Sequence, residues 1–252
     1  MKKSGLITRR NAIVTGLAAA GGFLITRLPD DLPPTYGNLL RMGDSFTYAA
    51  QRVLLPSGTL VKEYSHGDIT SFPATGTVDP GALDLPGLSD VYRELQHGSF
   101  AAWRLPVEGR VAAPRSFSLA EIKALPARTQ ITRHTCEEGW TAIGEWTGVP
   151  LSTVLDAVGI LQTARFVVFH SHDDWVDSID LLDALHPQTI LAYGMNGRDL
   201  PLAHGAPLRL RVERQIGYKS MKYIRRIVVT DEFEDGGAKG NIQNGWAWYT
   251  GI

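Results

Sequence analysis

The only cysteine of the chain, Cys136, lies in the stretch ITRHTCEEGWTAIGEWTGVPL at residues 131–151. A cysteine can pack as a small apolar side chain, attack as a nucleophile, or bind a metal as a thiolate. Packing is disfavoured because the neighbours at 132–135 and 137–138 are all polar. Nucleophilic attack would need a base, and His134 shares a face with Cys136 if this segment is extended.

A metal site at Cys136 would need further ligands. Zinc usually takes four, from Cys and His at regular spacing, and the sequence has no such set. A lone cysteine also excludes an internal disulfide. A single protein thiolate is enough only where a cofactor supplies the remaining ligands. The residues around Cys136 therefore leave two roles open, a nucleophile and a ligand in a cofactor-bound metal centre.

A second segment is strongly basic. Residues 198–226 contain eight Lys or Arg against two acids, in a chain whose formal net charge is −1. In PLRLRV, Arg209 and Arg211 would lie on one face of a strand, with the leucines on the other. The GYKSMK that follows combines a glycine turn with two lysines. Turn amides with Arg and Lys can form a phosphate cradle, and an ordinary solvated face is the alternative.

The elements that position these residues are expected to be short. Helices are predicted at 41–56, 118–126, 151–158 and 178–187, a loop at 71–87, a strand pair over 101–114, and strands at 164–170, 206–213 and 222–233. Short strands interleaved with short helices predict a mixed α+β domain, not a doubly wound sheet. The length of 252 residues, 44% hydrophobic, suits one substantial core. The nearly neutral net charge argues against a nucleic-acid partner.

The N-terminus has the composition of an export signal. Residues 1–25 have a basic start and an apolar run from Ala12 to Ile25, which is shorter than the ~20 residues a membrane span needs. TRRNAIV is similar to a twin-arginine motif, which implies export of the folded protein to the periplasm by the twin-arginine machinery. No clear A-x-A cleavage site follows, so an uncleaved membrane anchor stays open. A weak amphipathic or disordered N-terminus is the alternative.

Three blocks of sequence resemble the sulfite oxidase-like molybdopterin oxidoreductases. They are CEEGWTAIGEWTGVPLSTVLDAVG, RFVVFHSHDDW and LHPQTILAYGMNGRDLPLAHGAPLRLRVERQIGYKSMKYIRRI. The resemblance covers roughly residues 95–235, with the order and spacing of the blocks intact. The resemblance implies a single mixed α/β domain around one molybdenum–molybdopterin cofactor. It also implies that Cys136 is the thiolate ligand of molybdenum and therefore a catalytic residue.

The same resemblance assigns cofactor contacts by position. His204 and Arg209 in HGAPLR would hold the pterin and its phosphate. Ser220, Met221 and Lys222 in KSMK would line the phosphate end. The chemistry in such a site belongs to the cofactor, while the protein binds, orients and tunes it.

Two further contacts rest on weaker similarity. Ser171, which follows the expected strand FVVFH, matches a position where relatives have a small or hydroxyl residue near the cofactor. GDSFTY is similar to a segment where periplasmic methionine sulfoxide reductases have Asn and Tyr, which makes Asp44, Thr47 and Tyr48 candidate cofactor contacts.

The resemblance also gives a domain organisation. We expect an export signal at 1–25, a linker at 26–40 and the molybdopterin domain at 41–252, with its core at 95–235. Only about twenty residues follow GYKSMKYIRRIVV, so no C-terminal immunoglobulin-like dimerisation domain is expected. The sequence has no C-x-x-C-H haem motif, so electrons would pass to a separate membrane or soluble cytochrome.

The tail GNIQNGWAWYTGI bears on the substrate. Trp246 aligns loosely with a catalytic tyrosine of sulfite oxidases, although Tyr249 is near enough to substitute for it. An indole can donate a hydrogen bond but passes on a proton less readily than a phenol. We therefore expect oxygen removal from small S-oxides or N-oxides rather than sulfite oxidation. The alternatives are a non-catalytic exported anion-binding domain of the same fold, and a hydrolase that uses Cys136 and His134.

Overall fold

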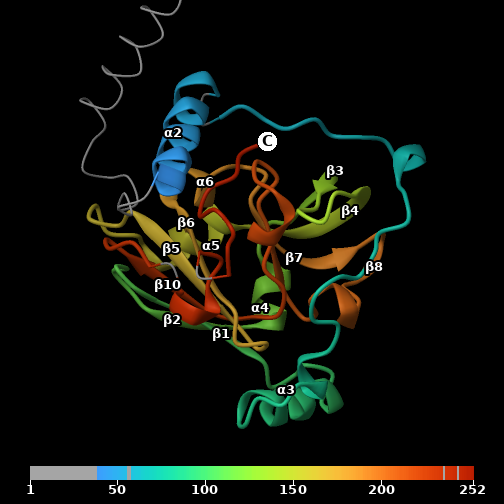
Figure 1. The fold of residues 1–252 in the computed structure, drawn as a ribbon. Helices are drawn as coiled ribbons and strands as arrows, with labels where there is room; N and C mark the ends of the chain where they lie inside the picture. Colours follow the sequence, from blue (N-terminus) through green and yellow to red (C-terminus); the bar gives the residue numbers. More distant parts are fainter. Residues whose placement is uncertain (1–38, 56–57, 235, 243) are drawn as a thin grey trace, which may run out of the picture.

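The computed structural model describes residues 39–252 apart from 56–57, 235 and 243 (Figure 1). The predicted export signal and most of the predicted linker lie outside these residues. Two five-stranded sheets, with helices between and around them, form the body of the described chain. The predicted mixed α+β fold class is thereby confirmed. Within the described part of the chain, no helix is long and apolar enough to cross a membrane.

The first sheet has the strand order β2-β1-β10-β5-β6. Only the β1–β10 pair is parallel, with Val107 opposite Ile227, and the other pairs are antiparallel. Its strands are β1 (Arg104–Gly109), β2 (Arg115–Ser118), β5 (Phe166–Ser171), β6 (Val176–Asp180) and β10 (Ile224–Thr230).

The second sheet presents the sequence stretch that contains Cys136. Its order is β3-β4-β7-β8, with β9 also paired to β7, and all of its pairs are antiparallel. Its strands are β3 (Arg128–Thr135), β4 (Thr141–Pro150), β7 (Ile190–Met195), β8 (Arg198–Asp199) and β9 (Arg209–Arg211). At Gly148 an added Cβ would lie 2.3 Å from the Leu191 carbonyl oxygen, so only glycine allows β4 and β7 to approach this closely.

The α-helices are short except for the first. They are α2 (Leu39–Leu54), α3 (Leu88–His97), α4 (Leu119–Ala124), α5 (Leu151–Val158) and α6 (Leu181–Ala184). The described residues also form five 3₁₀ turns: η1 (His66–Asp68), η2 (Pro80–Ala82), η3 (Leu202–His204), η4 (Gly217–Lys219) and η5 (Gly237–Lys239). Figure 1 shows α2 and α3 at opposite ends of the molecule, joined by a long connection around the second sheet.

The main hydrophobic core lies under the first sheet and against α5. Val107, Phe169 and Ile227 come from its strands, while Val154 and Leu155 come from α5, and all five are 0% exposed. A smaller cluster around Trp146 lies in the second sheet. A third, which includes Phe166 and Trp248, holds the C-terminal tail against the first sheet.

Two of the predicted helices are confirmed with their boundaries. Ser118 and Glu121 form the predicted capping box of α4, with Ser118 Oγ accepting from the Glu121 amide at 3.2 Å. Helix α5 ends at Gly159, whose φ of +67° is the left-handed conformation that glycine adopts readily.

Two other predictions were wrong in their boundaries. The strand pair expected over 101–114 is formed by β1 and β2, but β2 begins only at Arg115 because residues 110–114 leave the sheet. In that loop, the Ala112 amide donates to the Gly159 carbonyl at 2.7 Å. The helix expected over 178–187 is the single turn α6, because residues 176–180 extend as β6 and Asp180 then caps the helix.

Candidate functional site

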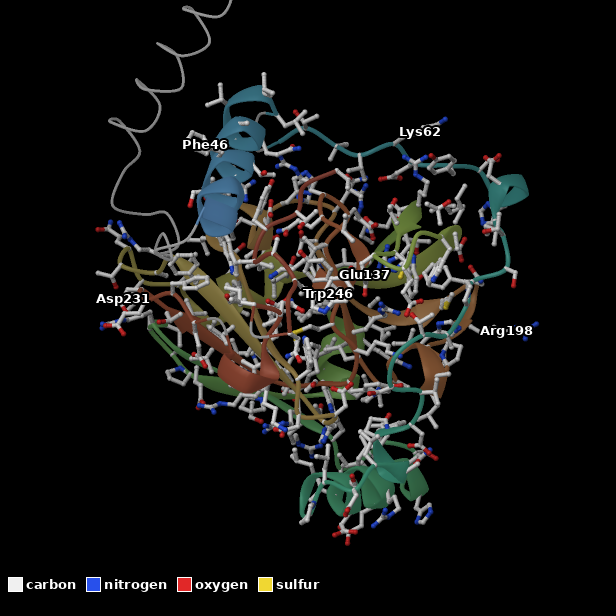
Figure 2. All side chains as sticks on the ribbon, in the orientation of Figure 1. Phe46, Lys62, Glu137, Arg198, Asp231 and Trp246 are labelled. Carbon is white, nitrogen blue, oxygen red and sulfur yellow. The ribbon has the colours of Figure 1, made fainter. Side chains whose placement is uncertain are left out.

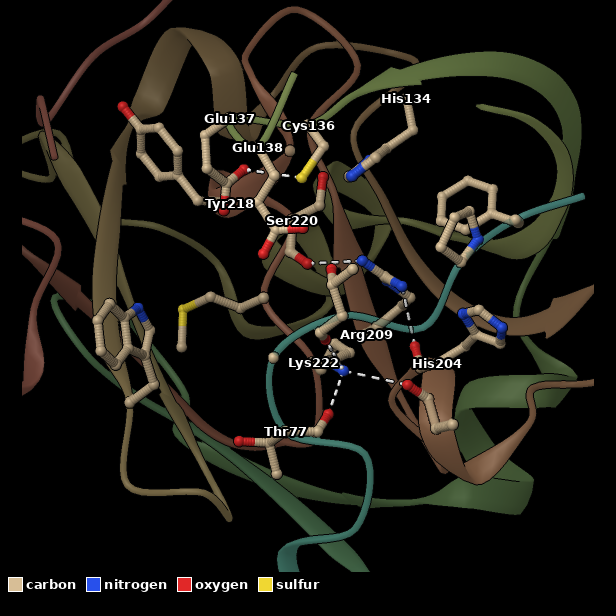
Figure 3. A pocket seen from close by; sticks show the side chains of 18 of the residues that line it. Thr77, His134, Cys136, Glu137, Glu138, His204, Arg209, Tyr218, Ser220 and Lys222 are labelled. Atoms are coloured by element: carbon tan, nitrogen blue, oxygen red, sulfur yellow. Dashed lines mark hydrogen bonds between the residues drawn. The ribbon is translucent and has the colours of Figure 1, made fainter. Parts of the chain in front are cut away.

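One cavity of about 310 Å³ opens beside the loop that joins β3 and β4 (Figure 3). Its volume is at the lower end of the range typical of ligand sites. Segments far apart in the sequence line it: Phe72, Pro73, Thr75, Gly76, Thr77, His134, Cys136, Glu137, Glu138, Trp140, Asp173, Trp175, Ala203, His204, Arg209, Gly217, Tyr218, Ser220, Met221, Lys222, Asn241 and Trp246.

Cys136 lies at the tip of the β3–β4 hairpin. The turn is tight, because the Cys136 amide donates to the Trp140 carbonyl at 2.9 Å and the Gly139 amide donates to the Cys136 carbonyl at 3.1 Å. The Cys136 Sγ lies 3.5 Å from Glu137 Oε2. Burial raises the pKa of the thiol to about 11, and the Glu137 carboxylate adds to this effect. The thiol is therefore not activated by its protein neighbours.

His134 cannot serve as a base for Cys136 in this arrangement. Its Nδ1 lies 2.8 Å from Arg211 Nη1, and a guanidinium only donates hydrogen bonds, so Nδ1 must accept. The proton of the neutral imidazole is then on Nε2. Burial lowers the pKa of His134 to about 2, with Arg211 and Arg209 acting in the same direction. This geometry argues against the Cys/His hydrolase.

Arg209 is the buried cation of the cavity. Its Nη1 donates to the His204 carbonyl and its Nη2 to the Ser220 carbonyl, both at 2.9 Å. Its Nε is buried without a hydrogen-bond partner among the described residues. Burial lowers the pKa of Arg209 to about 9, and nearby Arg211 adds to this. The solvated-face interpretation of the basic segment therefore fails at Arg209.

Lys222 connects two parts of the cavity wall. Its Nζ donates to the carbonyls of Thr75 at 2.8 Å and Ala203 at 3.0 Å, and also to that of Thr77. Burial lowers the pKa of Lys222 to about 8, followed by the charge of Arg209. These bonds hold residues 75–77 across the cavity, as the dashed lines in Figure 3 show.

The structure brings most of the predicted site residues together. Seven of them line the cavity: Cys136, His204, Arg209, Ser220, Met221, Lys222 and Trp246. Trp246 is 37% exposed, and Figure 2 shows it near Glu137. The assigned roles of these residues stay predictions.

Three other predicted residues, Ser171, Thr47 and Tyr48, do not line the cavity, and the side chain of Asp44 lies outside the described part of the structure. Ser171 lies at the end of β5, where its backbone carbonyl accepts from Arg225 Nε at 2.8 Å. Asp44, Thr47 and Tyr48 are in α2, and the hydroxyl of Tyr48 donates to Asp180 at 2.6 Å. Tyr48 thereby helps to attach α2 to the first sheet.

Sequence reasoning missed the segment 72–77, Tyr218 and Asn241 as cavity residues. The segment was predicted only as a loop, because Pro and Gly recur in it without a period. Phe72 at its start packs with ring centroids 5.1 Å from His134 and 5.3 Å from Trp146. No local sequence pattern predicts these contacts, because the partners of Phe72 are more than sixty residues away in the sequence.

The cavity suits a cofactor that carries both a metal and an anionic group. Cys136 offers a soft sulfur ligand, and Arg209 offers a buried Nε without a hydrogen-bond partner among the described residues. In the described part of the chain, no group of three or more His, Cys, Asp or Glu could hold a metal ion without help from a cofactor. A pterin dithiolene with a phosphate would match this set of groups.

The family model described as "Oxidoreductase molybdopterin binding domain" matches residues 93–237, which is more than half of the chain. The chain belongs to this family, and the sequence-based assignment to it is confirmed.

Two curated relatives give a more detailed comparison. The chain is 42% identical over 162 residues to a putative protein-methionine-sulfoxide reductase subunit, YedZ1, of Azospira oryzae, covering 64% of this chain and 60% of that protein. It is 36% identical over 141 residues to the catalytic subunit MsrP of the protein-methionine-sulfoxide reductase of Xanthomonas campestris, covering 50% of this chain and 44% of that protein. In both cases the chain spans less than two thirds of the relative's length.

A solved structure has the same fold over part of the chain. The sulfane dehydrogenase SoxCD from Paracoccus pantotrophus superimposes with a TM-score of 0.50 at 23% identity. The match covers 52% of this chain and 39% of that one. At this identity the likeness concerns the fold alone.

Proposed function

We propose that the chain binds a molybdenum–molybdopterin cofactor in this cavity and reduces a small uncharged S-oxide or N-oxide. Cys136 would hold the metal, and Arg209 would bind the phosphate with Ser220 and Lys222 beside it. The bound cofactor would supply reversible two-electron oxygen-atom transfer. The chain's own residues would bind and orient the substrate.

One observation carries the choice of substrate: two carboxylates, Glu137 and Glu138, directly follow Cys136 in the β3–β4 turn and line the cavity. Glu137 Oε2 lies 3.5 Å from the Cys136 sulfur, and Glu138 Oε2 accepts from Trp140 Nε1 at 3.0 Å. A sulfite dianion entering here would meet like charges, whereas an S-oxide carries no net charge. The buried guanidinium of Arg209 donates to the backbone carbonyls of His204 and Ser220.

The C-terminal tail supports the same choice. Trp246 lines the cavity, whereas Tyr249 is 2% exposed and packs 5.0 Å from the ring of Tyr48. This placement supports Trp246, rather than Tyr249, at the position that corresponds to the sulfite oxidase tyrosine. Tyr218 does line the cavity, but its hydroxyl donates to the Ala247 carbonyl at 2.5 Å.

The reaction needs two electrons and two protons. An S-oxide takes these up to give the sulfide and one water, and the S–O bond breaks. The electrons would come one at a time from a separate electron-transfer protein, a membrane or soluble cytochrome. The two relatives are both described as reductase subunits, which supports a partner of this kind.

The proposed location is the periplasm, after export of the folded chain by the twin-arginine route. Replacement of Arg9 and Arg10 by lysine should leave folded protein in the cytoplasm, as measured by fractionation and immunoblotting. An unchanged periplasmic pool would contradict this route.

The function is tested with the full chain produced in a host that makes molybdopterin. We expect about one molybdenum per chain, reduction of dimethyl sulfoxide or methionine sulfoxide with a reduced viologen dye, and poor sulfite oxidation. Sulfite oxidation in the usual range of about 10⁴–10⁸ M⁻¹s⁻¹, without S-oxide or N-oxide reduction, would overturn the proposal. Protein that takes up no molybdenum and is inert would favour the anion-binding alternative.

The carboxylates give a sharper version of this test. Glu137→Gln should raise kcat/KM for sulfite more than for dimethyl sulfoxide, because only the anion is repelled. Glu94→Gln, an exposed position in α3, is the matched control and should change neither value. Equal effects on the two substrates would show that Glu137 does not select by charge.

A further inference from the structure

A buried chain of polar side chains leads from the edge of the second sheet to His134. Arg211 bonds Glu213 through two contacts, Nε to Oε1 at 2.9 Å and Nη2 to Oε2 at 2.8 Å. Both side chains are 1% exposed. Gln130 Nε2 donates to the same Oε1 at 3.1 Å. The free end of the guanidinium, Nη1, is directed at His134 Nδ1.

This chain fixes the imidazole on several sides. The Arg211 guanidinium stacks 4.4 Å from the Trp146 ring centroid, which limits its movement. The His134 ring lies 5.1 Å from that of Phe72 and 5.4 Å from that of Trp140. A Cβ on Gly217 would lie only 2.3 Å from His134 Nε2, so the backbone there closes on the ring.

A buried Arg–Glu pair is costly and often contributes little net stability. Here it has a specific consequence. Since Arg211 can only donate, the neutral imidazole carries its proton on Nε2. Nε2 has no hydrogen-bond partner among the described residues, and His134 lines the cavity with Cys136, as Figure 3 shows. The ring thus presents one fixed N–H to the cavity and no lone pair.

We propose that His134 is a substrate-binding residue whose Nε2–H donates a hydrogen bond to the oxygen of the S-oxide, and that Arg211 and Glu213 are its positioning residues. This inference rests on the proposed function. An S-oxide oxygen is a strong, uncharged acceptor, and a neutral donor serves it without attracting anions. As electrons reach the S–O bond, negative charge grows on that oxygen, so the hydrogen bond strengthens toward the transition state.

The variants distinguish the effect of losing the His134 N–H donor from the effect of losing its aromatic ring. His134→Phe keeps an aromatic ring against Phe72 and Trp140 but removes the N–H. His134→Gln places an amide N–H₂ near the position of Nε2 and should recover part of the activity. Arg211→Met keeps the imidazole but removes its positioning partner. His97→Gln, an exposed residue in the last turn of α3, is the matched control.

Two readouts are expected to change. With dimethyl sulfoxide and a reduced viologen, kcat/KM per bound molybdenum should fall about tenfold in His134→Phe and less in His134→Gln, the range for loss of one hydrogen bond. Long-range ¹H–¹⁵N spectra of the histidine-labelled full chain should show the Nε2–H tautomer for His134. Arg211→Met should give a mixture of tautomers. Thermal unfolding and molybdenum content are measured on every variant.

The outcomes are distinct. A merely structural role would lower the melting temperature and the molybdenum content while KM and kcat per molybdenum stay as in the wild type, and that result overturns the inference. So does an Nδ1–H tautomer in the wild type. If the wild type binds molybdenum but reduces no S-oxide, the proposed function fails and the substrate contact fails with it. The tautomer measurement then still decides whether Arg211 fixes the ring.

Discussion

Gly217→Ala would introduce one methyl group into the tightest contact of the site. The added Cβ would lie 2.3 Å from both Cε1 and Nε2 of His134 and 3.1 Å from the Thr135 carbonyl oxygen. Ordinary contacts begin at 3.4 Å, so the ring must retreat by more than 1 Å. The ring cannot do so and keep its 2.8 Å bond to Arg211. Overpacking costs about 1–3 kcal/mol, and an unsatisfied buried donor costs a further ~1–3 kcal/mol.

We therefore expect Gly217→Ala to lower the free energy of unfolding by about 2–6 kcal/mol, a large part of the ~5–15 kcal/mol typical of a domain. Equilibrium urea unfolding of the full chain measures this. In a His134→Ala background most of the clash is gone, so the same substitution should cost much less. Gly67→Ala, whose new methyl would lie 3.8 Å from the nearest atom, is the control. An equal cost of Gly217→Ala in both backgrounds would refute the assigned contact.

Four further outcomes are expected, two from the site and two from buried charged or titratable groups elsewhere in the fold. Cys136→Ser should fold but lose redox turnover, because a hydroxyl is a harder ligand than a thiolate; normal turnover would exclude Cys136 as the metal ligand. Arg209→Ala should purify with substoichiometric molybdenum, measured by elemental analysis, and full occupancy would contradict its phosphate contact. Lys219→Met leaves the buried carboxylate of Asp177 without its 2.6 Å partner, so unfolding experiments should show a loss of about 3–5 kcal/mol. Burial lowers the pKa of His172 from 6.5 to about 4, so on acidification the unfolded chain binds a proton at this residue before the folded chain does. The free energy of unfolding should therefore fall by on the order of 3 kcal/mol as the pH drops from above 6.5 to 4. The midpoint of urea unfolding should depend less on pH in His172→Phe than in the wild type. The same pH dependence in both proteins would argue against a neutral buried imidazole at His172.

Local patterns were enough to predict several elements, whereas the cavity residues were predicted from the family resemblance. A capping box and a terminal glycine fixed α4 and α5, because both signals act within one turn of the helix. The motif blocks around Cys136 and Arg209 both contribute to one cavity. The helix predicted at 41–56 also forms, as α2, although Thr47 and Tyr48, which were predicted to contact the cofactor, do not line the cavity.

The remaining features depend on partners that are distant in the sequence. The 72–77 segment lies across the site because Lys222 bonds the carbonyls of Thr75 and Thr77, an interaction over about 145 residues. Strand β7 was missed because it is buried and its pairing with β4 and β9 gives no alternating pattern. Helix α6 was predicted too long because Asp180 both ends β6 and caps the helix.

Arg209 and Arg211 occupy equivalent positions in the alternating pattern of β9, so the sequence pattern cannot distinguish their roles. Both lie on the same face of β9, both are buried, and both approach the ring of Trp146, at 4.9 and 4.4 Å. Glu213, two residues further on, bonds Arg211 and not Arg209, so the Arg211 guanidinium is neutralised and its Nη1 is left to hold His134. Arg209 bonds two backbone carbonyls and keeps an unpartnered Nε, so it still carries a charge that an anion could satisfy. The difference between a positioning arginine and an anion-binding one is therefore made by a single carboxylate, and only the folded chain shows which arginine receives it.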